Sequence, residues 1–181
     1  MARAPVAASL ASGAALLALA AALLGATAPG SPAAAAPARA ASPPKCATSS
    51  LVMWLNSEDS GTAGSFYYHL ELANLSGHTC TLAGYPGVSA VSLGGRQIGA
   101  AAGREPGSTP RTVTLAPEAQ TTALIHLTDV GALPASCRPV AAAGFRVYPP
   151  GQTTSKVVPF PFRTCSNLAQ RALSVRAVKT E

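Results

Sequence analysis

Four cysteines constrain this chain more than any other feature, because no two of them lie close together. Structural zinc sites and redox sites use short spacings such as C-x-x-C, so neither kind of site is expected here. A cysteine nucleophile would require a partner histidine and would leave a thiol unpaired. An even number of widely spaced cysteines indicates disulfide bonds instead, as in proteins of oxidising compartments. The four are Cys46, Cys80, Cys137 and Cys165.

Four cysteines allow three pairings, and the spacing favours the two that join neighbours in sequence. We therefore expect the disulfides Cys46–Cys80 and Cys137–Cys165. Each closes a loop of about thirty residues, which removes roughly 3–4 kcal/mol of unfolded-chain entropy. That is a large part of the roughly 5–15 kcal/mol by which a domain is normally stable.

The N-terminal region differs in composition from the rest of the chain. Arg3 is followed by an apolar run over 6–24 and by A-x-A triplets, the pattern of a secretory signal peptide. We assign 1–28 to that peptide. The A-x-A triplets further along place the latest alternative cleavage point at residue 41. The alternative is an uncleaved anchor, since the run reaches the ~20 residues that a membrane helix needs. An Ala/Pro-rich linker over 29–45 follows, and no membrane insertion is expected after cleavage.

The remaining residues, 46–181, are enough for one domain with one core. Short alternating segments recur there, separated by glycine and proline turns, and they predict eight or nine strands. This pattern is typical of an all-β, antiparallel β-sandwich of immunoglobulin-like architecture, with a single closed sheet as the alternative. The expected strands cover 48–56, 65–75, 88–93, 96–100, 112–115, 121–127, 142–150, 156–160 and 173–178.

Several details within this pattern are specific enough to test. Trp54, near a cysteine, suits packing inside the sandwich. The strand 156–160 is expected at a sheet edge and is expected to end at its prolines. Residues 166–173 are compatible with a helical turn. Tyr85 lies in a Gly-Tyr-Pro-Gly turn, where we expect it to anchor the turn rather than to form part of a binding patch.

Charge and motifs argue against catalysis and against nucleic-acid binding. The net charge is +6, but the basic residues are scattered singly and are not interleaved with aromatics, so no nucleic-acid partner is expected. Ser89 lacks the second glycine of a G-x-S-x-G elbow, and Gly94-Gly95 is a hairpin signal rather than a phosphate loop. The adjacent acids Glu58 and Asp59 fall in a polar loop. The sequence predicts no enzyme activity and no cofactor.

The histidines supply one alternative. His69 and Glu71 are two apart on one predicted strand, and His126 lies on another, so the three could in principle hold a metal ion or form an enzyme site. The simpler interpretation is a polar strand face and a surface histidine. Asn74-Leu75-Ser76 matches the N-glycosylation pattern, which matters only in a host with that machinery.

A longer stretch carries a family resemblance. The segment "NLSGHTCTLAGYPG" over 74–87, then "VTLAP" over 113–117, "SCRP" and "FRTC" resemble the domain of unknown function 4232 family, exported actinobacterial proteins. Glu118 stands where that family has a glycine. The resemblance implies export, a β-sandwich and paired cysteines, and it implies no activity. The hallmark residues are Asn74, Cys80, Leu82, Gly84, Tyr85, Pro86 and Gly87.

The leading functional interpretation is a secreted or cell-wall-associated, non-catalytic binding module. Its partner would be an extracellular protein or a cell-wall component, which the sequence does not identify. The rival is an exported metal protein or enzyme that uses His69, Glu71 and His126. A structural protein of the cell wall is a third alternative.

Overall fold

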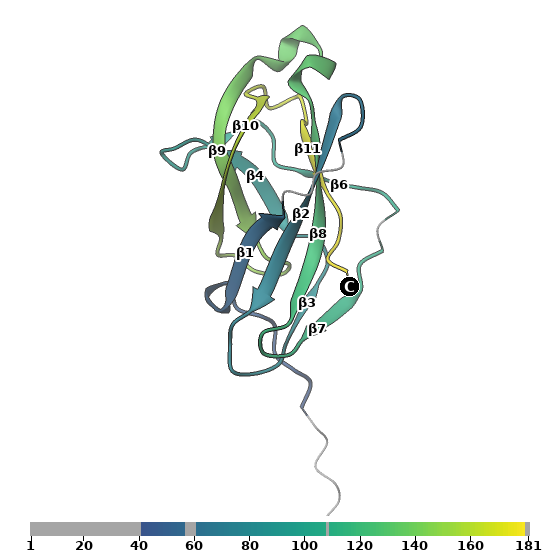
Figure 1. The fold of residues 1–181 in the computed structure, drawn as a ribbon, viewed down its shortest axis with the longest axis vertical. Helices are drawn as coiled ribbons and strands as arrows, with labels where there is room; N and C mark the ends of the chain where they lie inside the picture. The colour runs from purple at the N-terminus through teal and green to yellow at the C-terminus, as the bar shows by residue number, and fades with distance from the viewer. Residues whose placement is uncertain (1–40, 57–60, 108, 180–181) are drawn as a thin grey trace, which may run out of the picture. The chain divides into compact units, whose positions relative to one another are not determined.

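The computed structural model describes residues 41–56, 61–107 and 109–179. The signal peptide, most of the linker and the Glu58-Asp59 pair predicted from the sequence lie outside these ranges. Within them the protein is all-β, as predicted, with two larger sheets in separate layers and a small third one (Figure 1). Among the described residues no helix has the length and hydropathy to cross a membrane.

The strands form three separate sheets, with the orders β1-β2-β8-β11-β6, β10-β9-β4-β5 and β3-β7. All pairings are antiparallel except that of β11 with β6. Three 3₁₀ turns accompany them. The elements are η1 (Thr48–Ser50), β1 (Leu51–Asn56), β2 (Ser65–Asn74), β3 (Cys80–Ala83), β4 (Gly87–Val91), β5 (Gln97–Ile98), β6 (Gly103–Arg104), β7 (Thr112–Leu115), β8 (Gln120–Thr128), η2 (Val130–Ala132), η3 (Ala135–Cys137), β9 (Pro139–Tyr148), β10 (Lys156–Cys165) and β11 (Leu173–Val175).

One core lies between the two larger sheets. Successive side chains of a strand point to opposite faces, so alternate residues of β2 and β8 enter the core. Leu70 and Ile125 do so from the five-stranded sheet, and Phe145 and Val147 do so from the four-stranded sheet. These two antiparallel layers around a shared core confirm the predicted β-sandwich.

The strand β10 corrects one expectation. It was expected to stop at its prolines, but it continues through Pro159 and Pro161 to Cys165. It is the edge strand of its sheet, where a missing backbone N–H is tolerated, and its register with β9 shifts between Pro159 and Phe162. Gly144 makes this possible, because a Cβ there would lie 2.3 Å from the Val158 carbonyl oxygen.

Other details also differ from the sequence prediction. Trp54 does not pack inside the sandwich, since its side chain points out of β1 and is 38% exposed. The segment expected to form a helical turn holds a hydrogen-bonded turn over 167–170 and no helix, and Leu173 already belongs to β11. The strand β9 begins at Pro139, inside a segment expected to be loop. Eleven strands are present among the described residues, against the eight or nine predicted. Strands as short as β3 and β6 contain too few residues to show an alternating pattern.

Both expected disulfides are present, Cys46–Cys80 and Cys137–Cys165, and no described cysteine is free. The first joins the start of the domain to β3, where the backbone of Cys46 also donates to the Thr81 carbonyl. The second joins η3 to the end of β10. Each bond therefore fixes a segment that flanks the sandwich and that has few ladder hydrogen bonds of its own.

Asn74 is the last residue of β2 and is fully buried, with 0% of its surface exposed. Its amide nitrogen donates to the carbonyl oxygens of His78, Leu115 and Ala116 at 3.0–3.1 Å. Its amide oxygen accepts from the backbone N–H and the hydroxyl of Ser76, at 3.0 and 2.6 Å. One side chain thus joins the turn after β2 to the turn after β7. We call this set the Asn74 turn cluster.

Glu118 belongs to the same region. Its N–H donates to the Asn74 carbonyl, and its φ is +65°, in the left-handed region that favours glycine. The geometry explains why a glycine suits this position. The chain keeps the turn even with a glutamate in place of glycine.

Candidate functional site

The outward side of the five-stranded sheet carries the polar and aromatic side chains that the core does not use. Pairing places Tyr67 opposite His126, His69 opposite Leu124, and Trp54 opposite Glu71. Because cross-strand partners share a face, these residues form one surface, which we call the outer face. Its members include Val52, Trp54, Ser65, Tyr67, His69, Glu71, Thr122, Leu124, His126 and Ser174, and Arg176 borders it beside Leu124.

His126 is the centre of a hydrogen-bonded cluster on this face. Its Nε2 lies 2.9 Å from the Ser65 hydroxyl, and its Nδ1 lies 3.3 Å from the Ser174 hydroxyl and 3.4 Å from a Glu105 carboxylate oxygen. The Tyr67 ring stacks on the imidazole with centroids 4.7 Å apart. Residues from β2, β8, β11 and the segment after β6 therefore meet at one histidine. We call them the His126 cluster.

Glu105 is the anionic member of this cluster. It accepts from the Arg176 Nε at 2.5 Å and from the Ser174 hydroxyl at 2.9 Å. Burial alone would raise the pKa of the Glu105 carboxyl, but the hydrogen bonds from Arg176 and Ser174, with the charges of Arg176 and His126, outweigh it and lower the pKa. The carboxylate stays ionised and fixes the orientation of Arg176.

The order Ser65, His126, Glu105 in space resembles the nucleophile, base and acid of a serine hydrolase. Two observations argue against that role. The Ser65 N–H donates to the Thr62 carbonyl at 2.9 Å, so it is not available to stabilise an oxyanion. Ser65 also does not line the groove described next, where a substrate would be held. The same contacts join β2, β8, β11 and the segment after β6.

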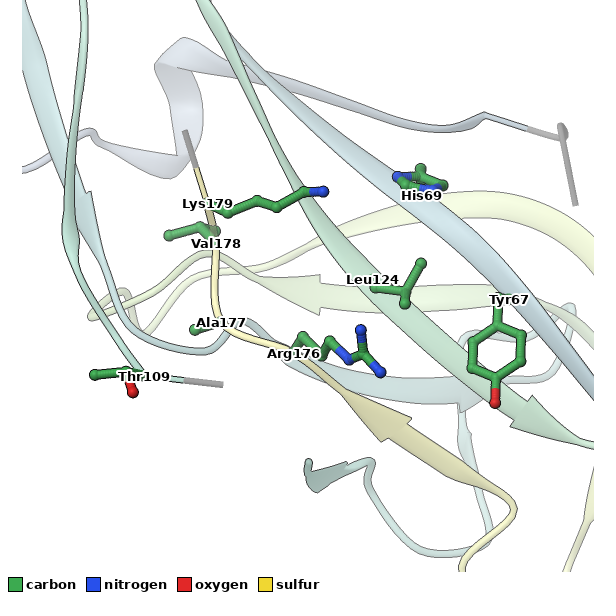
Figure 2. A pocket seen from close by; sticks show the side chains of 8 residues that line it. All are labelled: Tyr67, His69, Thr109, Leu124, Arg176, Ala177, Val178 and Lys179. Carbon is green, nitrogen blue, oxygen red and sulfur yellow. The ribbon is translucent and has the colours of Figure 1, made fainter. Parts of the chain in front are cut away.

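Beside the His126 cluster lies an open groove of about 380 Å³ (Figure 2). Tyr67, His69 and Leu124 form its sheet side, and the segment after β11 forms the other side. Arg176 and Lys179 reach toward the sheet side from that segment. The described lining consists of Tyr67, His69, Thr109, Leu124, Arg176, Ala177, Val178 and Lys179.

Backbone hydrogen bonds hold the segment that carries these two cations. Arg176 N–H donates to Leu124, Lys179 N–H donates to Thr122, and the Thr121 hydroxyl donates to the Lys179 carbonyl at 2.6 Å. Ala177 and Val178 are buried between them. The positions of Arg176 and Lys179 along β8 are therefore fixed by the fold rather than by their side chains.

The three residues proposed as metal ligands share the outer face but do not assemble into a site. His69 Nδ1 lies 3.3 Å from the Thr122 hydroxyl, and His126 is engaged as described. Glu71, expected on a polar, half-buried face, is only 6% exposed. Within the described ranges no group of three histidine, cysteine or acidic residues could hold a metal ion.

The residues that carry the resemblance occupy a different part of the molecule and have structural roles. Asn74 is the hub of its turn, Cys80 is in a disulfide, and Leu82 is in the core. Gly84 has a φ of +105°, and a Cβ on Gly87 would lie 3.3 Å from that of Tyr148.

Tyr85 anchors its turn, as expected from the sequence. Its hydroxyl reaches the Glu105 carbonyl at 3.5 Å, and the Arg104 guanidinium lies over its ring at 5.3 Å. The Gly-Tyr-Pro-Gly turn is thereby tied to the segment that supplies Glu105. None of the hallmark residues lines the groove.

The family described as a domain of unknown function (DUF4232) matches residues 46–179. The chain belongs to this family. Comparison with curated proteins and with solved structures gives no match. The DUF4232 match spans the whole sandwich, from the first cysteine to the segment that carries Lys179. The match gives no activity, so the outer face is interpreted from its own geometry.

Proposed function

We propose that this protein is a secreted or cell-envelope-associated binding module, without catalytic activity, that uses the outer face of its five-stranded sheet. The observation that carries the proposal is the groove beside the His126 cluster. It is open, it is lined by rings, aliphatic side chains and two cations, and its walls are held by strand ladders and backbone hydrogen bonds. A rigid, mixed polar and apolar hollow of a few hundred Å³ is the usual form of a ligand site.

Export is the second part of the proposal. Two disulfides suit an oxidising environment, where thiols are not kept reduced. The predicted signal peptide over 1–28 and the linker over 29–45 would deliver the domain, 46–181, outside the plasma membrane. Fractionation of the native host tests this: the protein should appear in the medium or envelope with no free thiols. A cytoplasmic protein with four free thiols would contradict it.

Binding through the outer face is tested by capturing partners from the native culture surface with the full chain. Leu124→Glu places a bulky charge in the groove, and we expect it to abolish saturable capture. Val157→Glu is the matched control, because Val157 is an exposed apolar residue on the other sheet. Thermal melts verify that both variants fold. Equal capture by wild type and Leu124→Glu would exclude the groove, and no saturable partner would exclude the function.

A further inference from the structure

The charges around the groove are arranged asymmetrically. Arg176 and Lys179 are the only charged side chains among its described lining residues, and both are exposed. Two carboxylates lie nearby. Glu105 accepts a hydrogen bond from the Arg176 Nε and does not line the groove, and Glu71 is buried. The remaining guanidinium nitrogens of Arg176 and the ammonium of Lys179 are thus presented to a ligand from one side (Figure 2).

The pairing of Arg176 with Glu105 also reduces the cost of binding. Glu105 is itself held by Ser174 and lies beside His126, so the guanidinium is oriented before any ligand arrives. A pre-oriented guanidinium forms charge-assisted hydrogen bonds with a carboxylate at a smaller loss of side-chain entropy. These contacts point to an anionic group as the part of the ligand that the groove fixes.

Ring surfaces extend the site beyond the groove. His69 lies at its rim, and Trp54 is the diagonal neighbour of His69 across the β1–β2 ladder, close enough for ring contacts with a shared ligand. Tyr67 supplies another ring on the sheet side. Adjacent strands are about 4.8 Å apart, so Trp54 on β1 lies one strand spacing from β2, which lines the groove. A ligand with flat, partly apolar units is complementary to this surface.

The backbone around the groove argues against an extended peptide. The groove lies on the face of the sheet, and the ladders of β2, β8 and the following segment already pair the backbone groups that a peptide strand would use. Recognition must therefore come from side chains. We propose that the groove binds an acidic polysaccharide, with a sugar carboxylate on Arg176 and Lys179 and sugar ring faces against Trp54, His69 and Tyr67. This inference rests on the binding function proposed above.

The chain provides its own reporter, because Trp54 is its single tryptophan. The full chain is titrated with polygalacturonate while the fluorescence of Trp54 is followed. We expect a saturable change that weakens as salt is added, since the anchoring contacts are ionic. Fully methyl-esterified polygalacturonate, which keeps the rings and loses the charge, should bind about tenfold more weakly or not at all.

Two charge reversals locate the site. Lys179→Glu should weaken polygalacturonate binding about tenfold or more, whereas Arg163→Glu, at an exposed position on β10 of the other sheet, should leave it unchanged. Trp54→Ala has no tryptophan fluorescence, so its binding is measured by isothermal calorimetry. It should be weaker because the ring contact is lost. Circular dichroism confirms that each variant is folded.

Other outcomes would overturn the inference. If the methyl ester bound as tightly as polygalacturonate, the carboxylates would not contribute to binding. If Lys179→Glu and Arg163→Glu lost the same affinity, the attraction would be non-specific. If poly-L-glutamate or single-stranded DNA bound more tightly than polygalacturonate, the ligand would be an acidic peptide or a nucleic acid and not a polysaccharide. If polygalacturonate fails while Leu124→Glu still abolishes capture from the culture surface, the ligand class is wrong and the binding function stands.

Discussion

The Asn74 turn cluster and the His126 cluster are both polar groups placed where strands meet, but their partners differ. Asn74 is neutral and fully buried, and its amide nitrogen binds only backbone carbonyls. His126 and Glu105 bind other side chains and stay partly exposed, at 25% and 15%. The first cluster fixes two turns, whereas the second connects strands beside a groove.

This difference separates stability from binding within one domain. A neutral amide satisfied by fixed carbonyls has one arrangement and no capacity for a ligand, so changes there should act on the free energy of unfolding. Ionisable side chains next to solvent can change charge or partner. Substitutions in the His126 cluster should therefore change how the free energy of unfolding depends on pH and how Arg176 is oriented. Their effect on stability at neutral pH should be small.

The largest expected effect is that of Asn74→Ala. It removes all the side-chain hydrogen bonds of Asn74, including the buried one to the Leu115 carbonyl, and should cost about 3 kcal/mol of unfolding free energy. Urea unfolding measures it. Ser76→Ala removes the hydroxyl bonds to the Asn74 oxygen and to the His78 carbonyl and keeps the backbone bond, so it should cost about 1 kcal/mol. Gln120→Ala, at an exposed position of β8, should cost almost nothing. Equal losses in all three would contradict a special role for Asn74.

Glu105→Gln should change how stability depends on pH. The pKa of Glu105 is lowered in the folded protein, below its ordinary value of 4.5, so its contribution is fully present above about pH 4.5 and is lost as pH falls through the folded pKa. Removing the charge should cost less than about 1 kcal/mol at pH 7 and should flatten the decline between neutral and acid pH.

Urea midpoints at pH 7 and pH 3 give this measurement. Ser174→Ala removes one of the hydrogen bonds to Glu105 and should produce a smaller change in the same direction. A variant with an unaltered acid slope would show that the Glu105 contacts do not persist in solution.

Glu118→Gly tests the Asn74 turn cluster in the opposite direction. Glycine removes the steric cost of φ +65° but adds freedom to the unfolded chain, so we expect a net gain of about 0.5 kcal/mol. Glu118→Ala keeps the steric cost and should give no gain, which separates the backbone effect from that of the charge. The comparison fails if alanine stabilises as much as glycine.

The smallest expected effect concerns Ser65. Because its N–H is already bonded to Thr62 and it does not line the groove, it should not react with a fluorophosphonate probe. Intact mass spectrometry after incubation provides the readout, with a known serine hydrolase as the positive control. A stoichiometric adduct that is lost in Ser65→Ala would make the His126 cluster catalytic and would end the non-catalytic interpretation.

Local periodicity was sufficient to predict the inward side of the central strand β2. In β2 the alternation of Leu70 with the polar His69 and Glu71 reports which side faces inward, because the side-chain period of a strand is two residues. The disulfide pairing was also within reach, since neighbours in sequence form short loops. The resemblance in sequence predicts a glycine at position 118, and the φ of +65° there agrees with that preference.

The site required information that no single segment contains. The partners of His126 come from β2, β11 and the segment after β6, and only the register of the sheet brings them together. Trp54 was misplaced because its face depends on which side of β1 meets the core. The course of β10 depends on Gly144 of a different strand, which the prolines themselves do not reveal.

The burial of Asn74 has a consequence for producing this protein. Asn74-Leu75-Ser76 is a glycosylation signal, and in a eukaryotic secretory pathway a glycan is attached while the chain is still unfolded. The modified nitrogen could no longer occupy its enclosed position or donate to three carbonyls, so such a host would yield misfolded material. Bacterial expression in an oxidising compartment avoids this loss. In yeast or mammalian cells, a Ser76→Ala chain would preserve the amide at the expense of its weaker contacts.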